Sequence, residues 1–275
     1  MGNPYWEEAK EEIQKWESSG PGFLAQVGDA ILWPVQKAAE MLIPKAVQEM
    51  VGKALIGFLE GLSKASAWTV SADAVRRRVA ARRKACHHGL KASDEAAKHY
   101  WAWNVSYAIA EGGVTGVTGL PGLVADIPAL FTICLRCIQQ IAHCYGYDTS
   151  EDLEREYVMH ILRTGSTGDI KAKMEFLIGL KQVEQVLLKV TWKKMNEALA
   201  RKEISRLSLL AAIRQFAKTL GIQITKRKAL QMVPAVGGLV GASFNGTFVN
   251  DVGRAAYMSY RRRFIDEHKG KRPAH

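Results

Sequence analysis

Three acidic residues, Glu111, Asp126 and Asp251, each stand beside a long apolar segment, and Arg136 follows the first of these segments. Carboxylates next to apolar residues can act as an acid–base pair, because burial raises their pKa toward neutrality. They can also cap helix N-termini or pair with an arginine. We favour capping and ion pairing. These four residues nevertheless form a candidate polar site, and a hydrolase-type enzyme built on the three acids stays an alternative hypothesis.

A second candidate for chemistry is Cys134-x-x-Cys137, which has His143 and Cys144 nearby. A structural metal site needs four ligands, commonly two such pairs, and a redox-active pair prefers the first turn of a helix. We expect these cysteines in the middle of a helix, as buried side chains. The sequence has no P-loop, GxSxG or GxGxxG pattern. We therefore predict no catalytic residues, no metal and no cofactor.

The elements beside these residues are two glycine-rich apolar segments, EGGVTGVTGLPGLVADIPALF at 111–131 and ALQMVPAVGGLVGASFNGTFVN at 229–250. Glycines four residues apart let two helix backbones approach closely. We predict two glycine-rich apolar helical hairpins whose close packing depends on Gly112, Gly116, Gly119, Gly122, Gly237 and Gly241.

Three environments for these hairpins stay open: a soluble core, a lipid surface into which they dip, and a full membrane span. The 22 uncharged residues of the second segment just reach the length of a span. Its proline and its polar end argue against one. In a lipid environment, the apolar contacts would come from Leu120, Leu123, Ile127, Leu130, Val236, Leu239, Val240 and Phe244.

The positive charge is concentrated toward the end of the chain. The last 75 residues hold 15 basic and 4 acidic residues, so they account for the whole net charge of +11. Such asymmetry favours an anionic partner, although plain solubility explains it as well. We predict that headgroups are bound by three basic clusters, Arg76, Arg77, Arg78, then Lys226, Arg227, Lys228, and Arg261, Arg262, Arg263. Nucleic acid is an unlikely partner, because no known nucleic-acid-binding motif is present.

Composition predicts an all-α fold, a multi-helix bundle. The 275 residues include only 8 prolines and are 48% hydrophobic, with helical rather than alternating periodicity. We expect an acidic amphipathic helix in 1–20 that begins at Asn3-Pro4, a single helical domain in 21–268, and a flexible basic tail in 269–275. Further helices should begin at Ser93 and at Pro128, the latter capped by Asp126 and ending at Gly146.

Another helix should run from Glu151 to Arg163 and stop at Gly165, with long helices over 169–202 and 204–220. The first fifteen residues lack a signal peptide pattern, and the four cysteines do not form a disulfide framework. A cytoplasmic location is therefore expected.

Four stretches of the chain form a recognisable set. They are TGLPGLVADIPALF and LRCIQQIAHCYGYD within 118–148, then YVMHILRTG, and finally VPAVGGLVGASFNGTFVNDVGRAAYMSYRRRF at 233–264. Together they resemble the EcsC protein family. The resemblance covers about 101–264 and does not reach the first 40 residues. It implies a bacterial protein, no catalytic motif, and a link to ABC transport, because the family is named for a member encoded beside ABC transporter components.

Together these observations predict a non-enzymatic, membrane-associated or lipid-binding accessory protein at the inner face of the membrane. Its expected partners are an anionic membrane surface or lipid, and an ABC transporter component. A soluble scaffold that binds an acidic protein is the other alternative.

Overall fold

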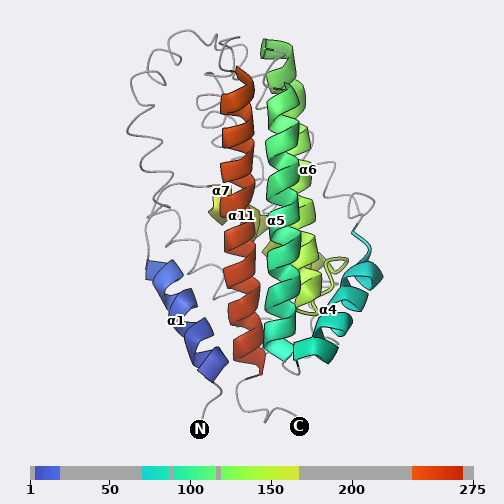
Figure 1. Ribbon diagram of the computed structural model, residues 1–275, viewed down its shortest axis with the longest axis vertical. Helices are drawn as coiled ribbons and strands as arrows, with labels where there is room; N and C mark the ends of the chain where they lie inside the picture. The colour runs from blue at the N-terminus through green and yellow to red at the C-terminus, as the bar shows by residue number, and fades with distance from the viewer. Residues whose placement is uncertain (1–3, 19–69, 87–88, 116–118, 167–236, 269–275) are drawn as a thin grey trace, which may run out of the picture.

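The computed structural model describes residues 4–18, 70–86, 89–115, 119–166 and 237–268 (Figure 1). This part of the chain consists of six helices without a strand, which confirms the predicted all-α class. The helices are α1 (Pro4–Ser18), α4 (Ala72–Cys86), α5 (Gly89–Thr115), α6 (Gly119–Cys144), α7 (Asp152–Ser166) and α11 (Gly237–Glu267). The helices expected over 169–202 and 204–220 lie outside the described residues.

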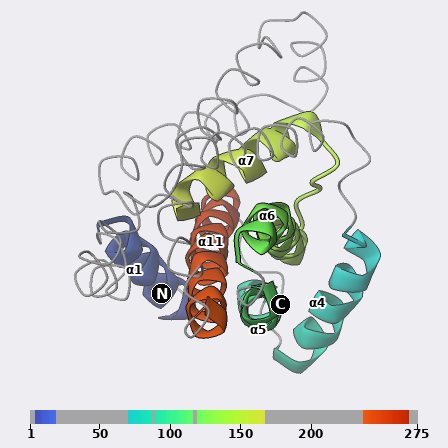
Figure 2. The ribbon, with the colours of Figure 1, turned by 90° about the horizontal axis from the view of Figure 1, so that it is seen from above.

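Three long helices form the centre of the described structure. Helix α5 packs against α11 on one side and α6 on the other, and it runs antiparallel to both (Figure 1). Seen from above, α7 lies across α6 and α11, while α4 lies beside α5 (Figure 2). Helix α1 packs against the C-terminal half of α11.

The core lies where these helices meet. It is lined by aromatic and branched apolar side chains of α6, α7 and α11, among them Phe131, Ile138, Tyr157, Val252 and Tyr260, all fully buried. Burying one such side chain contributes about 1.5–3 kcal/mol to folding.

Glycines allow close helix packing at three positions that the sequence did not predict for this role. A Cβ at Gly165 of α7 would lie 2.4 Å from the Cα of Val252 on α11. A Cβ at Gly253 of α11 would lie 2.4 Å from Cδ1 of Trp101 on α5, and one at Gly246 would lie 2.5 Å from a side-chain carbon of Ile109. These three glycines therefore set how closely α11 approaches α7 and α5.

Of the six predicted glycines, Gly112 is a buried residue of α5, and Gly119 and Gly122 lie in the first turn of α6. Gly237 and Gly241 lie in the first turns of α11. Gly116 lies outside the described residues.

Two helix ends lie where the sequence predicts them. Helix α1 begins at Pro4, as predicted. Helix α6 ends before Gly146, whose φ is 92°. There the Tyr147 N–H donates to the Ala142 carbonyl at 3.1 Å and the Gly146 N–H donates to the His143 carbonyl at 3.2 Å, the pair of bonds of a Schellman cap.

Three predicted boundaries are wrong. Helix α5 begins at Gly89 instead of Ser93, α6 begins at Gly119 instead of Pro128, and α7 continues through Gly165 to Ser166. Pro128 lies inside α6, because a proline removes one helical hydrogen bond without preventing a helix on both sides of it. Gly165 is part of α7, and its missing side chain lets α7 lie close to α11.

The second glycine-rich segment is described from residue 237 onward. From there it forms part of one continuous helix that runs to Glu267, so its described part contains no turn of a hairpin. In the first segment, α5 and α6 pack against each other, and residues 116–118 between them lie outside the described residues.

Candidate functional site

The predicted headgroup cluster Arg261–Arg263 is buried. The three residues are 2%, 9% and 3% exposed, and their side chains pair with carboxylates from three other elements. Successive helix residues point about 100° apart, so three consecutive arginines can all be buried only where neighbours surround the helix. This placement differs from the expected surface cluster, and these arginines act as internal ion-pair partners.

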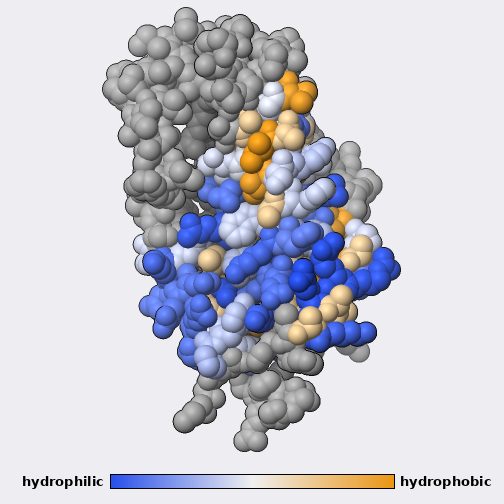
Figure 3. All heavy atoms as spheres, viewed as in Figure 1, coloured by the Kyte–Doolittle hydropathy of each residue, from blue (hydrophilic) through white to orange (hydrophobic). Residues whose placement is uncertain are grey.

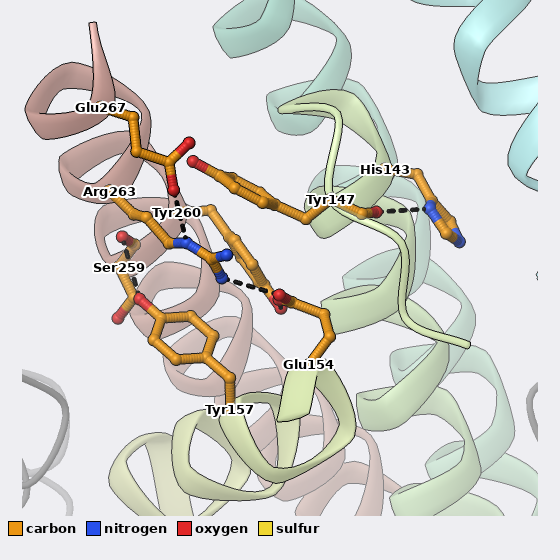
Figure 4. A network of polar contacts seen from close by, with 8 residues as sticks. All are labelled: His143, Tyr147, Glu154, Tyr157, Ser259, Tyr260, Arg263 and Glu267. Atoms are coloured by element: carbon orange, nitrogen blue, oxygen red, sulfur yellow. Dashed lines mark hydrogen bonds and ion pairs between the residues drawn. The ribbon is translucent and has the colours of Figure 1, made fainter. Parts of the chain in front are cut away.

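One of these buried pairs joins Arg263 of α11 to Glu154 of α7 (Figure 4). Arg263 Nη1 lies 2.7 Å from Glu154 Oε2, and both side chains are at most 3% exposed. Tyr260 donates to the other Glu154 oxygen at 2.7 Å, and Arg263 Nε contacts Glu267 at 3.0 Å. The guanidinium also lies 3.9 Å from the ring centroid of Tyr147, which adds a cation–π contact.

A second cluster joins Arg261 to Asp94 of α5. Arg261 Nε lies 2.9 Å from Asp94 Oδ2, and its Nη1 contacts Glu12 of α1. Tyr5 of α1 and Tyr145, just after α6, each donate to Asp94 at 2.6 Å. Together with the Arg262–Glu17 pair at 2.6 Å, these contacts attach α1 to the rest of the molecule.

The pKa shifts in both clusters have a common cause. Burial raises the pKa of Asp94 and Glu154, while the arginine charges and tyrosine hydroxyls oppose this rise. Burial also raises the pKa of Tyr145 and Tyr260 well above the usual value for tyrosine, so both remain protonated donors. The carboxylates therefore have charged and hydrogen-bonded partners suited to a structural role.

His143 is a buried, uncharged histidine. Its Nδ1 lies 2.8 Å from the Tyr147 carbonyl (Figure 4), and its Nε2 lies 3.3 Å from the hydroxyl of Thr149. A carbonyl only accepts, so Nδ1 carries the proton and Nε2 accepts from Thr149. Burial is the main reason that the pKa of His143 is lowered.

The cysteines of α6 are buried free thiols. Cys134 and Cys137 are fully buried, and burial raises the pKa of Cys137 to about 12. A thiol with so high a pKa is a poor nucleophile at neutral pH. Within the described ranges, no group of three or more His, Cys, Asp or Glu side chains is placed to hold a metal ion.

The structure describes three of the four side chains of the predicted polar site, those of Glu111, Arg136 and Asp251. Glu111 on α5 accepts a hydrogen bond from Asn245 of α11 at 2.8 Å. Arg136 lies exposed on α6 and has no carboxylate partner among the described residues. Asp251 is half-buried on α11, and Asp126 lies in α6 with its side chain outside the description.

The residues predicted to contact lipid also have different environments. Leu130 is fully buried, and Phe244 is half-buried and stacks on Phe248 with a centroid distance of 5.8 Å. Five further positions lie on α6 and α11 without described side chains, namely Leu120, Leu123, Ile127, Leu239 and Val240. Val236 and the cluster Lys226, Arg227, Lys228 lie outside the described residues.

Helix α4 carries a basic cluster that is exposed. Arg76, Arg77 and Arg78 are exposed, and so are three further cations, Arg82, Arg83 and Lys84. Arg82 lies 3.6 Å from Glu95, while Arg77 and Arg83 have no carboxylate partner among the described residues.

Sequence reasoning missed an apolar stripe on α5, formed by Trp103, Tyr107 and Val114. Their exposed fractions are 60%, 56% and 73%, and their spacing of four and seven residues places them on one side of the helix. The face of the molecule over α5 and α11 has a run of apolar residues in its upper part and is hydrophilic below (Figure 3). The spacing could have revealed the stripe, but not its exposure.

Within the described helices, none combines the length and the apolar composition that a membrane span needs.

A pocket of about 490 Å³ lies where α4, α5 and α6 meet. Among the described residues that line it are one charged side chain, that of Arg136, the polar side chains of Gln139 and Gln140, and the ring of Tyr100. This pocket gives Arg136 a surrounding that the sequence did not predict.

Comparison with known proteins supports the resemblance found in the sequence. The model of the EcsC protein family matches residues 7–265, so the match extends well before the motifs that carried the resemblance. "Uncharacterized protein YdbA" of Bacillus subtilis is 31% identical over 65% of this chain and 60% of its own length. "Protein EcsC" of the same organism is 25% identical over 61% of this chain and 63% of its own.

The matched region therefore spans about three fifths of the length of these curated relatives. No solved structure matches the chain.

Proposed function

This chain belongs to the EcsC protein family, and from that premise we propose that it is a non-enzymatic accessory protein that attaches to an anionic membrane surface. The observation that carries the proposal is the exposed basic face of α4, which packs beside the helix that bears the apolar stripe. The location at the inner face of the membrane and the ABC transporter partner are part of the same proposal. They rest on the family resemblance.

The two surfaces supply the two kinds of interaction that peripheral binding needs. A cation close to an anionic leaflet contributes about 1 kcal/mol, and α4 exposes six cations within nine residues. Tryptophan and tyrosine suit the interface, because their rings are apolar and their edges are polar. Trp103 and Tyr107 are both more than half exposed, so they can enter the headgroup region without unfolding the bundle.

A test is co-sedimentation of the full chain with vesicles of phosphatidylcholine alone and with 30% phosphatidylglycerol. Only the anionic vesicles should carry the protein down. Arg77→Gln with Arg83→Gln should weaken partitioning by about 30-fold, since two cations near the leaflet contribute about 2 kcal/mol. The matched control is Lys15→Gln with Arg254→Gln, which removes two exposed cations from α1 and α11.

Equal losses in the two double variants would mean that total charge, not α4, governs binding. Trp103→Ser with Tyr107→Ser should remove the part of the binding that persists at high salt. If the wild-type chain sediments with neither vesicle, the membrane proposal fails. A soluble scaffold for an acidic protein partner would then replace it.

A further inference from the structure

We infer that the pocket between α4, α5 and α6 binds a small phosphate-bearing molecule that also carries a hydroxyl group, the chemistry of a glycerol phosphate. The inference goes beyond the proposed function, because a soluble ligand of this kind needs no membrane. The pocket volume of about 490 Å³ falls within the range of small-molecule sites.

Gln139 supplies the first argument. Its side chain is 4% exposed and lines the pocket, yet its Oε1 has no hydrogen-bond partner among the described residues. The neighbouring Gln140 accepts a hydrogen bond from Asn104 Nδ2 at 2.7 Å. Buried acceptors are seldom left without a donor. A ligand that donates to Gln139 Oε1 would complete the pocket.

Arg136 supplies the second argument. It lies one turn before Gln139 on α6 and lines the same pocket. Its guanidinium has no described carboxylate partner, and no acidic side chain is in the described lining. A guanidinium binds phosphate oxygens through two parallel hydrogen bonds. The available cation therefore points to an anionic group on the ligand.

The surroundings of the pocket favour a hydroxyl over an amine as the ligand group that donates to Gln139 Oε1. Arg78 lies over the ring of Tyr100, 5.4 Å from the centroid, at the pocket wall. Arg136 is the charged residue of the described lining, and the charge of Arg78 over the Tyr100 ring adds to a positive surrounding that disfavours an ammonium group. Val70, Val75 and Leu135 form apolar walls that suit the short carbon chain between a hydroxyl and a phosphate.

The test is isothermal titration calorimetry of the full chain with glycerol 3-phosphate, inorganic phosphate and glycerol at low salt. Glycerol 3-phosphate should bind, inorganic phosphate should bind more weakly, and glycerol should not bind. Arg136→Gln should weaken both phosphate compounds at least tenfold. Gln139→Leu should weaken glycerol 3-phosphate to the level of inorganic phosphate and leave inorganic phosphate itself unchanged.

Arg254→Gln removes an exposed arginine from α11 and should leave binding unchanged. Arg136 is exposed, so its variant should fold even if Gln139→Leu does not. A short-chain phosphatidylglycerol below its micelle concentration distinguishes the two sources of the ligand. Tighter binding than glycerol 3-phosphate indicates a lipid headgroup, and weaker binding indicates a soluble metabolite.

Absence of binding by all these probes would overturn the inference. Binding that survives both Arg136→Gln and Gln139→Leu would also overturn it. Neither result would contradict vesicle binding through α4. That binding is tested with Arg77 and Arg83, which are not in the described pocket lining.

Discussion

Replacing Arg263 by methionine should destabilise the fold by about 3–5 kcal/mol, the cost of leaving a buried charge without its partner. Glu154 would remain 2% exposed with Tyr260 as its remaining described donor. The guanidinium contact with the Tyr147 ring at 3.9 Å would be lost as well. Methionine keeps most of the apolar stem of arginine, so little of the loss should come from packing.

The measurement is urea unfolding followed by circular dichroism at 222 nm. The matched control is Arg254→Met, which makes the same exchange at an exposed position of the same helix. It should change the free energy of unfolding by no more than about 0.5 kcal/mol. A domain's total stability is about 5–15 kcal/mol, so the Arg263 variant should unfold at a visibly lower urea concentration.

A double-mutant cycle separates the ion pair from other effects. Combining Arg263→Met with Glu154→Gln removes both charges, so the double variant should recover part of the loss, with a coupling energy of at least about 1.5 kcal/mol. If Arg263→Met costs less than about 1 kcal/mol, the buried pair does not hold α7 against α11. A double variant as unstable as the sum of the single variants would also refute a stabilising coupling between the two charges.

Three further outcomes follow from glycine packing and from burial. Gly165→Ala should destabilise the fold by about 1–3 kcal/mol, because the added methyl group would lie 2.4 Å from the backbone of Val252. Gly113→Ala should instead stabilise the fold by about 0.5–1 kcal/mol in the same unfolding assay, because its methyl group would lie 3.9 Å from the side chain of Ala242. Because burial lowers the pKa of His143, the unfolded chain binds more protons, so stability should be full above a pH of about 6.5 and fall as the pH drops below it. In urea unfolding, the free energy of unfolding should fall less between pH 7.5 and pH 5.5 for His143→Gln than for the wild type. The same fall in both proteins would exclude this histidine as the cause. Burial raises the pKa of Glu156, so the charged carboxylate destabilises the fold more as the pH rises above the pKa that this residue has in the unfolded chain. Glu156→Gln should therefore stabilise the fold more at pH 7 than at pH 4.

Local signals predicted the ends of several helices correctly. Pro4 begins α1, and Ala9, Ile13 and Trp16, whose spacing predicted an amphipathic helix, are its buried residues. Gly146 ends α6 with the positive φ that glycine adopts readily. These features depend on residues within a few positions of one another, so the sequence is sufficient to predict them.

The start of α6 could not be found in this way. The residues from Gly119 to Ile127 are helical although they include glycines and a proline, which are weak or poor helix formers in isolation. In proteins, packing against neighbouring helices supplies most helix stability. The close-approach glycines show the same limit, because Gly165, Gly246 and Gly253 are recognised only once their neighbours across the helix interface are known.

The sequence likewise predicted some residues of the candidate sites and missed others. The sequence predicted Arg136 as a functional candidate, and it marks a pocket, but the sequence did not reveal the unpartnered Gln139 beside it. Trp103 and Tyr107 have the spacing of an ordinary core face, and only the arrangement of the helices leaves them exposed.

The sequence by itself determined the helical class, the start of α1, the end of α6 and the number and sign of the charges. Only the tertiary structure decided which charges face solvent. Arg76–Arg78 and Arg261–Arg263 are equivalent as sequence, yet the first cluster is exposed and the second is buried. The difference arises because a buried arginine needs a carboxylate at its guanidinium, and Glu12, Asp94 and Glu154 reach this part of α11 from more than 100 residues away along the chain.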